Sequence, residues 1–270
     1  MEMPMSPASS SASLARLARL TCCLPRSWAC GLGVAAAAAG HAATADAPQA
    51  CSVHSGPAAI PVVELYTSEG CNSCPSADRW LGNLKGRSDV VALAFHVDYW
   101  DRLGWKDRFA SAAFTQRQVE QQAVNGARFA YTPQVVIDGQ DRKDWPRVRV
   151  AAPTAPSPVS IVLSRDGERV VASVSTQAAA PARLAAYWAV TEFGHRTAVK
   201  AGENEGATLA HEFVVRDYQA VAAWPAAGGV AHSISYLPRD AADPAHPRKL
   251  NLVVIDAASG RPLQALSLGC

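Results

Sequence analysis

Three features are missing from this sequence, and each absence argues against a class of protein. The chain holds no run of about 18 strongly apolar residues, the length that a membrane-spanning helix needs, so we expect no integral membrane span. Neither charge dominates: 25 Lys and Arg residues against 23 Asp and Glu residues leave a net charge of +2, which argues against nucleic acid as a partner. A second CxxC motif and a closely spaced histidine pair, which would complete a zinc site, are also missing. We therefore expect neither a metal nor another cofactor.

The amino-terminal segment has the composition of an export signal. Residues 1–30 carry three arginines and a single acidic residue, an alanine-rich apolar run follows at 31–40, and small residues provide A-x-A sites at 43–47. This order predicts a secretory signal peptide over residues 1–47, cleaved after Ala45 or Ala47, and hence a secreted or periplasmic protein. An organellar transit helix at 14–20 is the alternative, and a lipid anchor at Cys30 is a weaker one.

Cleavage of that peptide would remove three of the seven cysteines and leave an even number. The four that remain are Cys51, Cys71, Cys74 and Cys270. Cys51 and Cys270 bracket the remaining chain, and a disulfide between them would close a very long loop, worth about 4 to 5 kcal/mol in the chain-entropy account. Both thiols could instead stay free at frayed termini, so this pair is a candidate structural disulfide.

The first half of the remaining chain alternates strand and helix patterns. Buried strands are predicted at 61–67 (PVVELYT) and 90–97 (VVALAFHV), each followed by a helical pattern, and a third strand is predicted at 134–137. Asp138-Gly139 then marks a tight turn into a fourth strand. The order βαβαββ over residues 58–150 predicts a small mixed sheet whose first crossover is parallel and whose last pair is a hairpin.

The second half of the chain has a different pattern. A linker rich in Pro, Ala and Ser occupies 151–158, and beyond it the helical periodicity fades. Short strand-like runs with turn residues between them follow over 159–270, which predicts a small β-sandwich-like domain. A length of 270 residues, 49% of them hydrophobic, is compatible with two such domains.

The motif Cys71-Asn72-Ser73-Cys74 stands between the first predicted strand and the first helix. Free amide groups and the positive end of the helix dipole would stabilise a thiolate at Cys71 and lower its pKa below the ~8.5 of an ordinary thiol. Cys71 would then be the nucleophile, and Cys74, one turn later, would resolve a mixed disulfide. The alternatives are a static structural disulfide and half of a zinc site.

A second element is the sequence Tyr131-Thr132-Pro133, directly before the strand at 134–137. Proline cannot donate to the hydrogen-bond ladder of a central strand, so its presence at the strand start needs a reason. If the Thr132–Pro133 peptide bond is cis, Thr132 would present its backbone beside the dithiol, where an extended substrate peptide could pair with it. A trans proline that simply marks the strand start is the alternative.

Strand, CxxC helix and Thr-Pro strand together resemble the thioredoxin fold. More specifically, four blocks, VVELYTSEGCNSCPSAD, FHVDYWDRLGWKDRF, YTPQVVIDG and KAGENEGATLAHEFVVR, resemble a family of secreted thioredoxin-like proteins known as domain of unknown function 1223. The resemblance covers residues 58–270 and implies a thioredoxin-like domain followed by a β-rich one. One departure is that the segment after Asp138-Gly139 is short, so the closing helix of a thioredoxin fold is expected to be reduced or absent, with Trp145 or the β-rich domain covering the sheet.

Two further residues are candidates for tuning the dithiol. Glu64, on the first strand, could be a buried carboxylate that takes up the proton of the resolving thiol, or it could face solvent or Lys106. His96 ends the second strand in a polar and aromatic cluster that extends to Asp107, at the edge where open α/β sheets bind ligands. We expect that cluster to be structural in the main, and the charged turn at 202–206 to contact the first domain.

The function that these residues favour is an exported thiol–disulfide oxidoreductase that acts on protein or low-molecular-weight thiols and disulfides, with a redox partner protein as a further candidate. One alternative is a copper-binding or copper-delivery protein that uses the two thiolates and His96. The other is a non-enzymatic envelope binding protein in which Cys71 and Cys74 form a structural disulfide.

Overall fold

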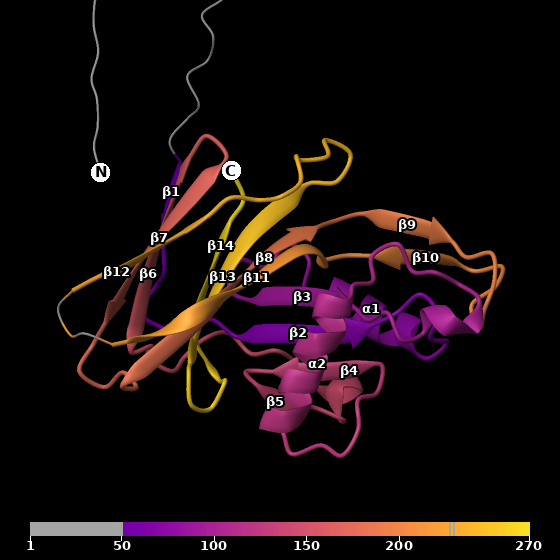
Figure 1. Cartoon of the computed structure of the whole chain (residues 1–270), viewed down its shortest axis with the longest axis horizontal. Helices are drawn as coiled ribbons and strands as arrows, with labels where there is room; N and C mark the ends of the chain where they lie inside the picture. The colour runs from indigo at the N-terminus through magenta and orange to yellow at the C-terminus, as the bar shows by residue number, and fades with distance from the viewer. Residues whose placement is uncertain (1–50, 227, 229) are drawn as a thin grey trace, which may run out of the picture. The chain divides into compact units, whose positions relative to one another are not determined.

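The computed structural model describes residues 51–226, 228 and 230–270, which form one compact unit (Figure 1). The predicted signal peptide at 1–47 lies outside the described residues. Within the described part of the chain, no helix is long and apolar enough to cross a membrane.

An eight-stranded sheet runs through the middle of this unit, in the order β14-β13-β8-β11-β3-β2-β4-β5. The amino-terminal half supplies β2 (Val62–Thr67), β3 (Val91–His96), β4 (Gln134–Ile137) and β5 (Gln140–Asp141). The carboxyl-terminal half supplies β8 (Arg183–Glu192), β11 (Val214–Pro225), β13 (Arg248–Asp256) and β14 (Pro262–Leu268). β2 and β3 pair in parallel, whereas β4 pairs with β2 and β5 in antiparallel fashion. The predicted parallel crossover and closing hairpin are therefore present.

Helices cover the two faces of the central strands. α1 (Cys74–Gly82) packs on the face that carries Val63 and Leu65, whereas α2 (Ala112–Val124) packs on the face that carries Val62 and Tyr66. Every residue of β2 and β3 is consequently buried, because each strand has a helix or another layer on both sides. This two-sided burial explains why both strands are almost continuously apolar in sequence.

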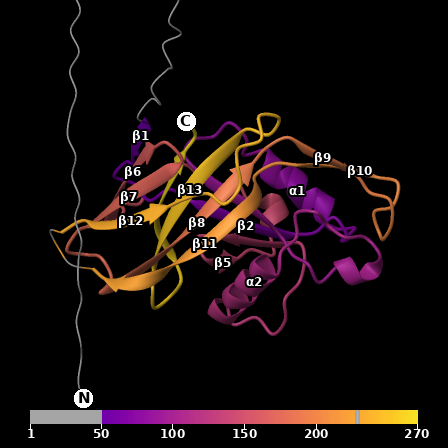
Figure 2. The same ribbon diagram turned by 45° about the horizontal axis from the view of Figure 1, so that its top comes forward.

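A second, four-stranded sheet packs against the carboxyl-terminal part of the first. Its order is β1-β6-β7-β12, formed by β1 (Cys51–His54), β6 (Val159–Asp166), β7 (Arg169–Thr176) and β12 (His232–Tyr236). Alternate residues of β6 and β7 point inward and form one apolar core with Trp188 of β8 and Leu252 of β13. The sandwich-like packing expected for residues 159–270 thus uses strands from two sheets, and Figure 2 shows it from a second side.

The predicted division of the chain at the linker separates ranges that the structure joins in one sheet. β11 of the second range lies parallel to β3 of the first, with Val214 opposite Ala94. After β5 the chain forms only a short 3-10 turn, η2 (Trp145–Arg147), in place of a helix. Trp145 packs edge-on against Trp80 of α1, 5.7 Å between ring centroids, and is partly buried against the apolar cluster that Val63 and Leu65 of β2 share with α1.

Candidate active site around the Cys71–Cys74 disulfide

Cys71 and Cys74 form a disulfide where β2 passes into α1, with 5.4 Å between their Cα atoms. Cys74 is the first residue of α1, Pro75 follows in the first turn, and the first turn carries no acidic side chain. Proline is tolerated there because first-turn amides have no partner within the helix. Both cysteines are buried, with 1% of Cys71 and 0% of Cys74 exposed.

The charged turn at 202–206 contacts the first predicted domain, as expected, and it does so at the disulfide loop, residues 68–73 between β2 and α1. It connects β9 (His195–Ala198) with β10 (Thr208–His211), the two strands of a hairpin. The side-chain amide of Asn204 donates to the backbone carbonyls of Glu69, at 2.8 Å, and Cys71, at 3.0 Å. The backbone amide of Asn72 donates to Oε2 of Glu203 at 3.1 Å. These bonds hold the turn against the loop that carries the nucleophile candidate.

Thr132 and Pro133 lie at the same end of the sheet as the disulfide loop. Their peptide bond is cis, and the register of β2 with β4 sets Tyr66 opposite Gln134, the residue after Pro133. The indole Nε1 of Trp100 donates to Oγ1 of Thr132 at 2.8 Å. Trp100 also backs onto Gly70, where an added Cβ would lie 3.0 Å from the Cβ of Trp100. Trp100 therefore joins Thr132 to the loop that precedes Cys71.

Glu64 does not face the disulfide. Side chains alternate along a strand, and Glu64 points to the α2 side of β2, opposite the side on which α1 packs. Its buried carboxylate accepts a hydrogen bond from the hydroxyl of Tyr66 at 2.9 Å and is also bound by Arg117 and Tyr187. Glu64 therefore neither faces solvent nor pairs with Lys106; its charged partner is the guanidinium of Arg117. Glu64 is part of a buried ion pair in the core.

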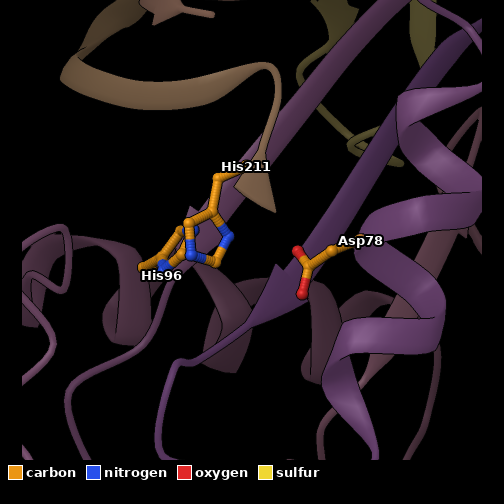
Figure 3. Close-up of side chains that lie close together, drawn as sticks. All are labelled: Asp78, His96 and His211. Carbon is orange, nitrogen blue, oxygen red and sulfur yellow. The ribbon is translucent and has the colours of Figure 1, made fainter. Parts of the chain in front are cut away.

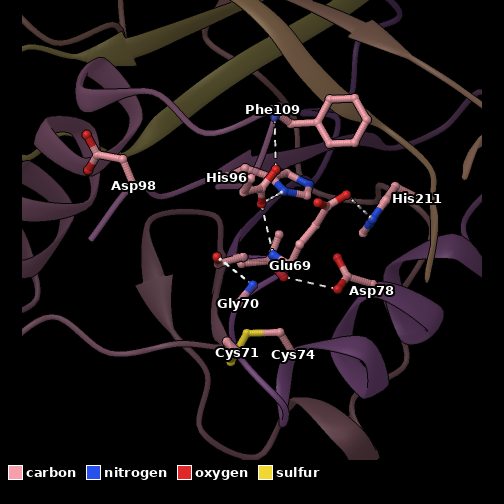
Figure 4. A network of polar contacts seen from close by, with 12 residues as sticks. Glu69, Gly70, Cys71, Cys74, Asp78, His96, Asp98, Phe109 and His211 are labelled. Atoms are coloured by element: carbon pink, nitrogen blue, oxygen red, sulfur yellow. Dashed lines mark hydrogen bonds and ion pairs between the residues drawn. A yellow bond between two sulfur atoms is a disulfide. The ribbon is translucent and has the colours of Figure 1, made fainter. Parts of the chain in front are cut away.

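His96 faces the α1 side and has a carboxylate partner. Its Nδ1 lies 2.6 Å from Oδ2 of Asp107, and both side chains are fully buried. Burial alone would lower the pKa of His96, but the charge and hydrogen bond of Asp107 outweigh it, so the pKa is raised. Burial likewise opposes ionisation of Asp107, yet His96 and two backbone amides lower its pKa to about 2. One of those amides belongs to Glu69, which ties the pair to the disulfide loop (Figure 4).

Two residues join this group from other elements. Asp78 stands on α1, one turn after Cys74, and its Oδ2 accepts from the hydroxyl of Thr67 at 3.0 Å. Burial raises the pKa of Asp78, although the charges of His211 and His96 act in the opposite direction. His211 ends β10, and its Nε2 lies 3.2 Å from Oε1 of Glu69. The three side chains of Asp78, His96 and His211 thus gather beside the disulfide loop (Figures 3 and 4).

The pKa of Glu69 is lowered in this setting. Burial acts to raise it, but the nearby imidazole of His211 and the hydrogen bond from Trp105 outweigh that effect. The indole of Trp105 donates to Oε2 of Glu69 at 2.8 Å. The residue before Gly70 and Cys71 is therefore held as a carboxylate.

The structure also joins Cys51 and Cys270 in a disulfide, with 6.2 Å between Cα atoms and a sequence separation of 219. Cys51 begins β1 at the edge of the four-stranded sheet, whereas the CxxC loop follows β2 of the eight-stranded sheet. This second disulfide ties the start of the described chain to its last residue.

Sequence reasoning overlooked several residues of the site. Trp100 and Asn204 contact the disulfide loop and Asp78 accepts a hydrogen bond from Thr67 directly before it, but none of the three was a candidate in its own right. The spacing of Asp78 from Cys74, four residues on a helix, is a signal that could have found it, because such residues share a helix face. The contacts of Asn204 and His211 had no local signal, since both residues lie more than 100 positions from Cys71 in the chain.

Comparison with known proteins gives two matches and no activity. A family model described as "Protein of unknown function (DUF1223)" matches residues 62–255. Among solved structures, the X-ray crystal structure of protein AGR_C_4864 from Agrobacterium tumefaciens is similar, with a TM-score of 0.58 and 26% sequence identity over 79% of this chain and 96% of that chain. No curated protein matches the chain. The family match spans the disulfide loop, the β9–β10 hairpin and most of the β-rich half together.

Proposed function

The chain belongs to the DUF1223 family, and from the geometry of its disulfide site we propose that it is an exported thiol–disulfide oxidoreductase with a thioredoxin-like centre. The observation that carries the proposal is the position of the Cys71–Cys74 pair at the start of α1, at the same end of the sheet as Thr132 and Pro133. The amides and dipole of a helix start favour a thiolate, and no acidic side chain in that turn opposes it.

The proposed reaction exchanges one disulfide for another. A substrate thiolate attacks the sulfur of Cys71, the bond to Cys74 breaks, and Cys74 leaves as a thiolate that takes up a proton. A second substrate thiol then attacks the mixed disulfide, which releases an oxidised substrate and the reduced Cys71–Cys74 pair. The same steps in reverse reduce a substrate disulfide. Two electrons and two protons move in each cycle.

The amino-terminal end of β4, where Thr132 and Pro133 precede the strand, is the proposed docking site for the substrate. Thr132 and Pro133 lie next to the disulfide loop through Trp100, and a backbone edge at this position can pair with an extended peptide. Two substrate classes are therefore proposed: proteins with exposed cysteines, and low-molecular-weight thiols.

Burial of the two sulfurs makes access a requirement of this function. Because Asn204 and Glu203 bond to the disulfide loop, the turn at 202–206 has to leave the loop before a protein substrate reaches Cys71. We expect Asn204→Ala to accelerate exchange at Cys71 by roughly 30-fold, since loss of about two hydrogen bonds at ~1 kcal/mol each weakens the docked state by about 2 kcal/mol.

Export is supported by composition and cysteine usage. The signal-peptide pattern of residues 1–47 is accompanied by two disulfides in the described chain, and disulfides persist in oxidising compartments. The amino-terminal residue of the purified protein, determined by mass spectrometry after expression with its own leader, tests this part: a start at 46 or 48 is expected.

The test of the activity is disulfide exchange with glutathione and with a reduced or oxidised protein substrate. The Cys51→Ser, Cys270→Ser double variant isolates the CxxC pair, and Cys71→Ser in that background is the inactive control. In the same background, Cys74→Ala should accumulate a mixed disulfide through Cys71. A Cys71–Cys74 disulfide that stays inert in the folded protein, with Asn204→Ala as well as with Asn204, would instead identify it as a structural staple.

A further inference from the structure

Three potential metal ligands meet beside the disulfide loop without belonging to the proposed exchange chemistry. Asp78 comes from α1, His96 from the end of β3 and His211 from the end of β10. One donor atom of each lies within 4.8 Å of the donor atoms of the other two. Figure 3 shows the two imidazole rings close together, with the Asp78 carboxylate directed toward them.

Each histidine in this group is buried and has at least one ring nitrogen without a hydrogen bond among the described residues. His96 is 0% exposed; Asp107 binds its Nδ1, and its Nε2 has no hydrogen-bond partner among the described residues. His211 is 2% exposed, and within the described chain neither of its ring nitrogens has a hydrogen bond, although Nε2 lies 3.2 Å from a Glu69 oxygen. Buried polar atoms of this kind normally have a partner, so a ligand that accepts lone pairs from imidazole would complete the site.

The orientation of His96 matches that of a metal-binding histidine. Such histidines commonly donate their second ring nitrogen to a carboxylate, which fixes the ring and leaves the other nitrogen to bind the ion. Asp107 provides that carboxylate, and its own oxygens are held by the backbone amides of Glu69 and Phe109. Glu69, beside His211, adds a second negative group that would offset the charge of a cation.

We propose that Asp78, His96 and His211 form a binding site for a divalent transition-metal ion of the Zn²⁺ class. Two imidazole nitrogens and one carboxylate oxygen are a donor set that Zn²⁺ and neighbouring first-row ions accept, whereas Mg²⁺ and Ca²⁺ prefer oxygen alone. Three protein ligands leave one coordination position for water or another ligand.

The site has to contract slightly when the ion binds. Zn–N and Zn–O bonds of about 2.1 Å at tetrahedral angles place donors about 3.4 Å apart, compared with a limit of 4.8 Å here. Asp78 is the side chain that can move, because it is only half-buried, whereas His96 and His211 are buried. A bound ion would also tie the β9–β10 hairpin to α1 and β3, since each ligand comes from a different element.

The test is metal binding to the purified, fully oxidised protein. Isothermal titration with Zn²⁺ should give one ion per chain, and Co²⁺ should give visible bands of nitrogen and oxygen coordination without a thiolate charge-transfer band. Asp78→Asn and, separately, His211→Gln should each weaken Zn²⁺ affinity at least tenfold, because even residues outside the first ligand shell change affinity by 10- to 100-fold. Zn²⁺ should raise the melting temperature of the wild-type protein more than that of either variant.

His232→Gln is the matched control, because His232 lies on β12 of the other sheet, stacked on Trp224. This variant should bind Zn²⁺ as the wild-type protein does. Absence of stoichiometric binding by the wild-type protein, or equal affinity in wild type, Asp78→Asn and His211→Gln, would overturn the proposal. If a variant fails to fold, the stoichiometry and Co²⁺ spectrum of the wild-type protein decide. Because disulfide exchange is measured separately, failure of the metal site leaves the proposed oxidoreductase activity standing.

Discussion

The buried ion pair between Glu64 and Arg117 allows a direct test of where the structure places Glu64. Arg117 lies on α2, 5% exposed, and its guanidinium stacks over the Tyr187 ring at 3.9 Å as it binds the Glu64 carboxylate. Arg117→Met keeps an apolar stem of similar length against that ring and removes the charge. The carboxylate of Glu64 would then be buried with only the hydroxyls of Tyr66 and Tyr187 as partners.

We expect Arg117→Met to lower the free energy of unfolding by about 3 to 5 kcal/mol, the cost of leaving one charge of a buried pair uncompensated. The double variant Glu64→Gln, Arg117→Met removes both charges and should recover most of this loss. Replacing both members of a buried ion pair by uncharged side chains often changes stability little. The double variant is therefore expected to lose only about 1 kcal/mol of unfolding free energy.

The assay is equilibrium unfolding in urea at neutral pH with both disulfides intact, followed by tryptophan fluorescence and by circular dichroism. Glu120→Gln is the control, because Glu120 lies on the same helix but is exposed, and its removal should change stability by less than about 0.5 kcal/mol. A destabilisation below about 1 kcal/mol for Arg117→Met would refute the burial argument. If Glu64→Gln slowed disulfide exchange at Cys71 without a loss of stability, Glu64 would be the proton acceptor after all.

Three further predictions concern parts of the structure outside this pair. Cys270→Ser should lower the unfolding free energy by up to about 5 kcal/mol, because the disulfide to Cys51 closes a loop of 219 residues; an unchanged urea midpoint would contradict it. Gly70→Ala should cost about 1 to 3 kcal/mol and increase the reactivity of the disulfide, since the new Cβ meets Trp100 at 3.0 Å, whereas unaltered urea unfolding and exchange would exclude that contact. All six tyrosines have a raised pKa, mainly through burial. Three of them are almost fully buried: Tyr66, Tyr187 and Tyr236. Since their phenols stay protonated in the folded chain, the stability that they contribute is complete below pH ~10 and declines above it, by about 4 kcal/mol per pH unit for the three together. Phenolate absorbance should therefore rise only as circular dichroism reports unfolding, and three phenolates titrating near pH 10 in folded protein would contradict this.

The sequence by itself determined the local features of the site. The continuous apolar runs before Cys71 and up to His96 identify strands that are buried on both faces. The Cys pair follows the first of these strands, where α1 begins. Asp138-Gly139 specifies the β4–β5 turn, with positive φ angles at both residues, 50° and 76°. These features depend on neighbours within a few residues, which a single sequence displays.

Only the tertiary structure decided which distant residues meet those features. The face that Glu64 occupies depends on which helix packs on which side of β2, and the contact of Asn204 with Cys71 depends on where the β9–β10 hairpin docks. The group of Asp78, His96 and His211 likewise forms because β11 lies beside β3, so that the end of β10 reaches the end of β3. Strand order across a sheet joins segments more than 100 residues apart, and no local periodicity encodes it, because the same alternating pattern fits many neighbours equally well.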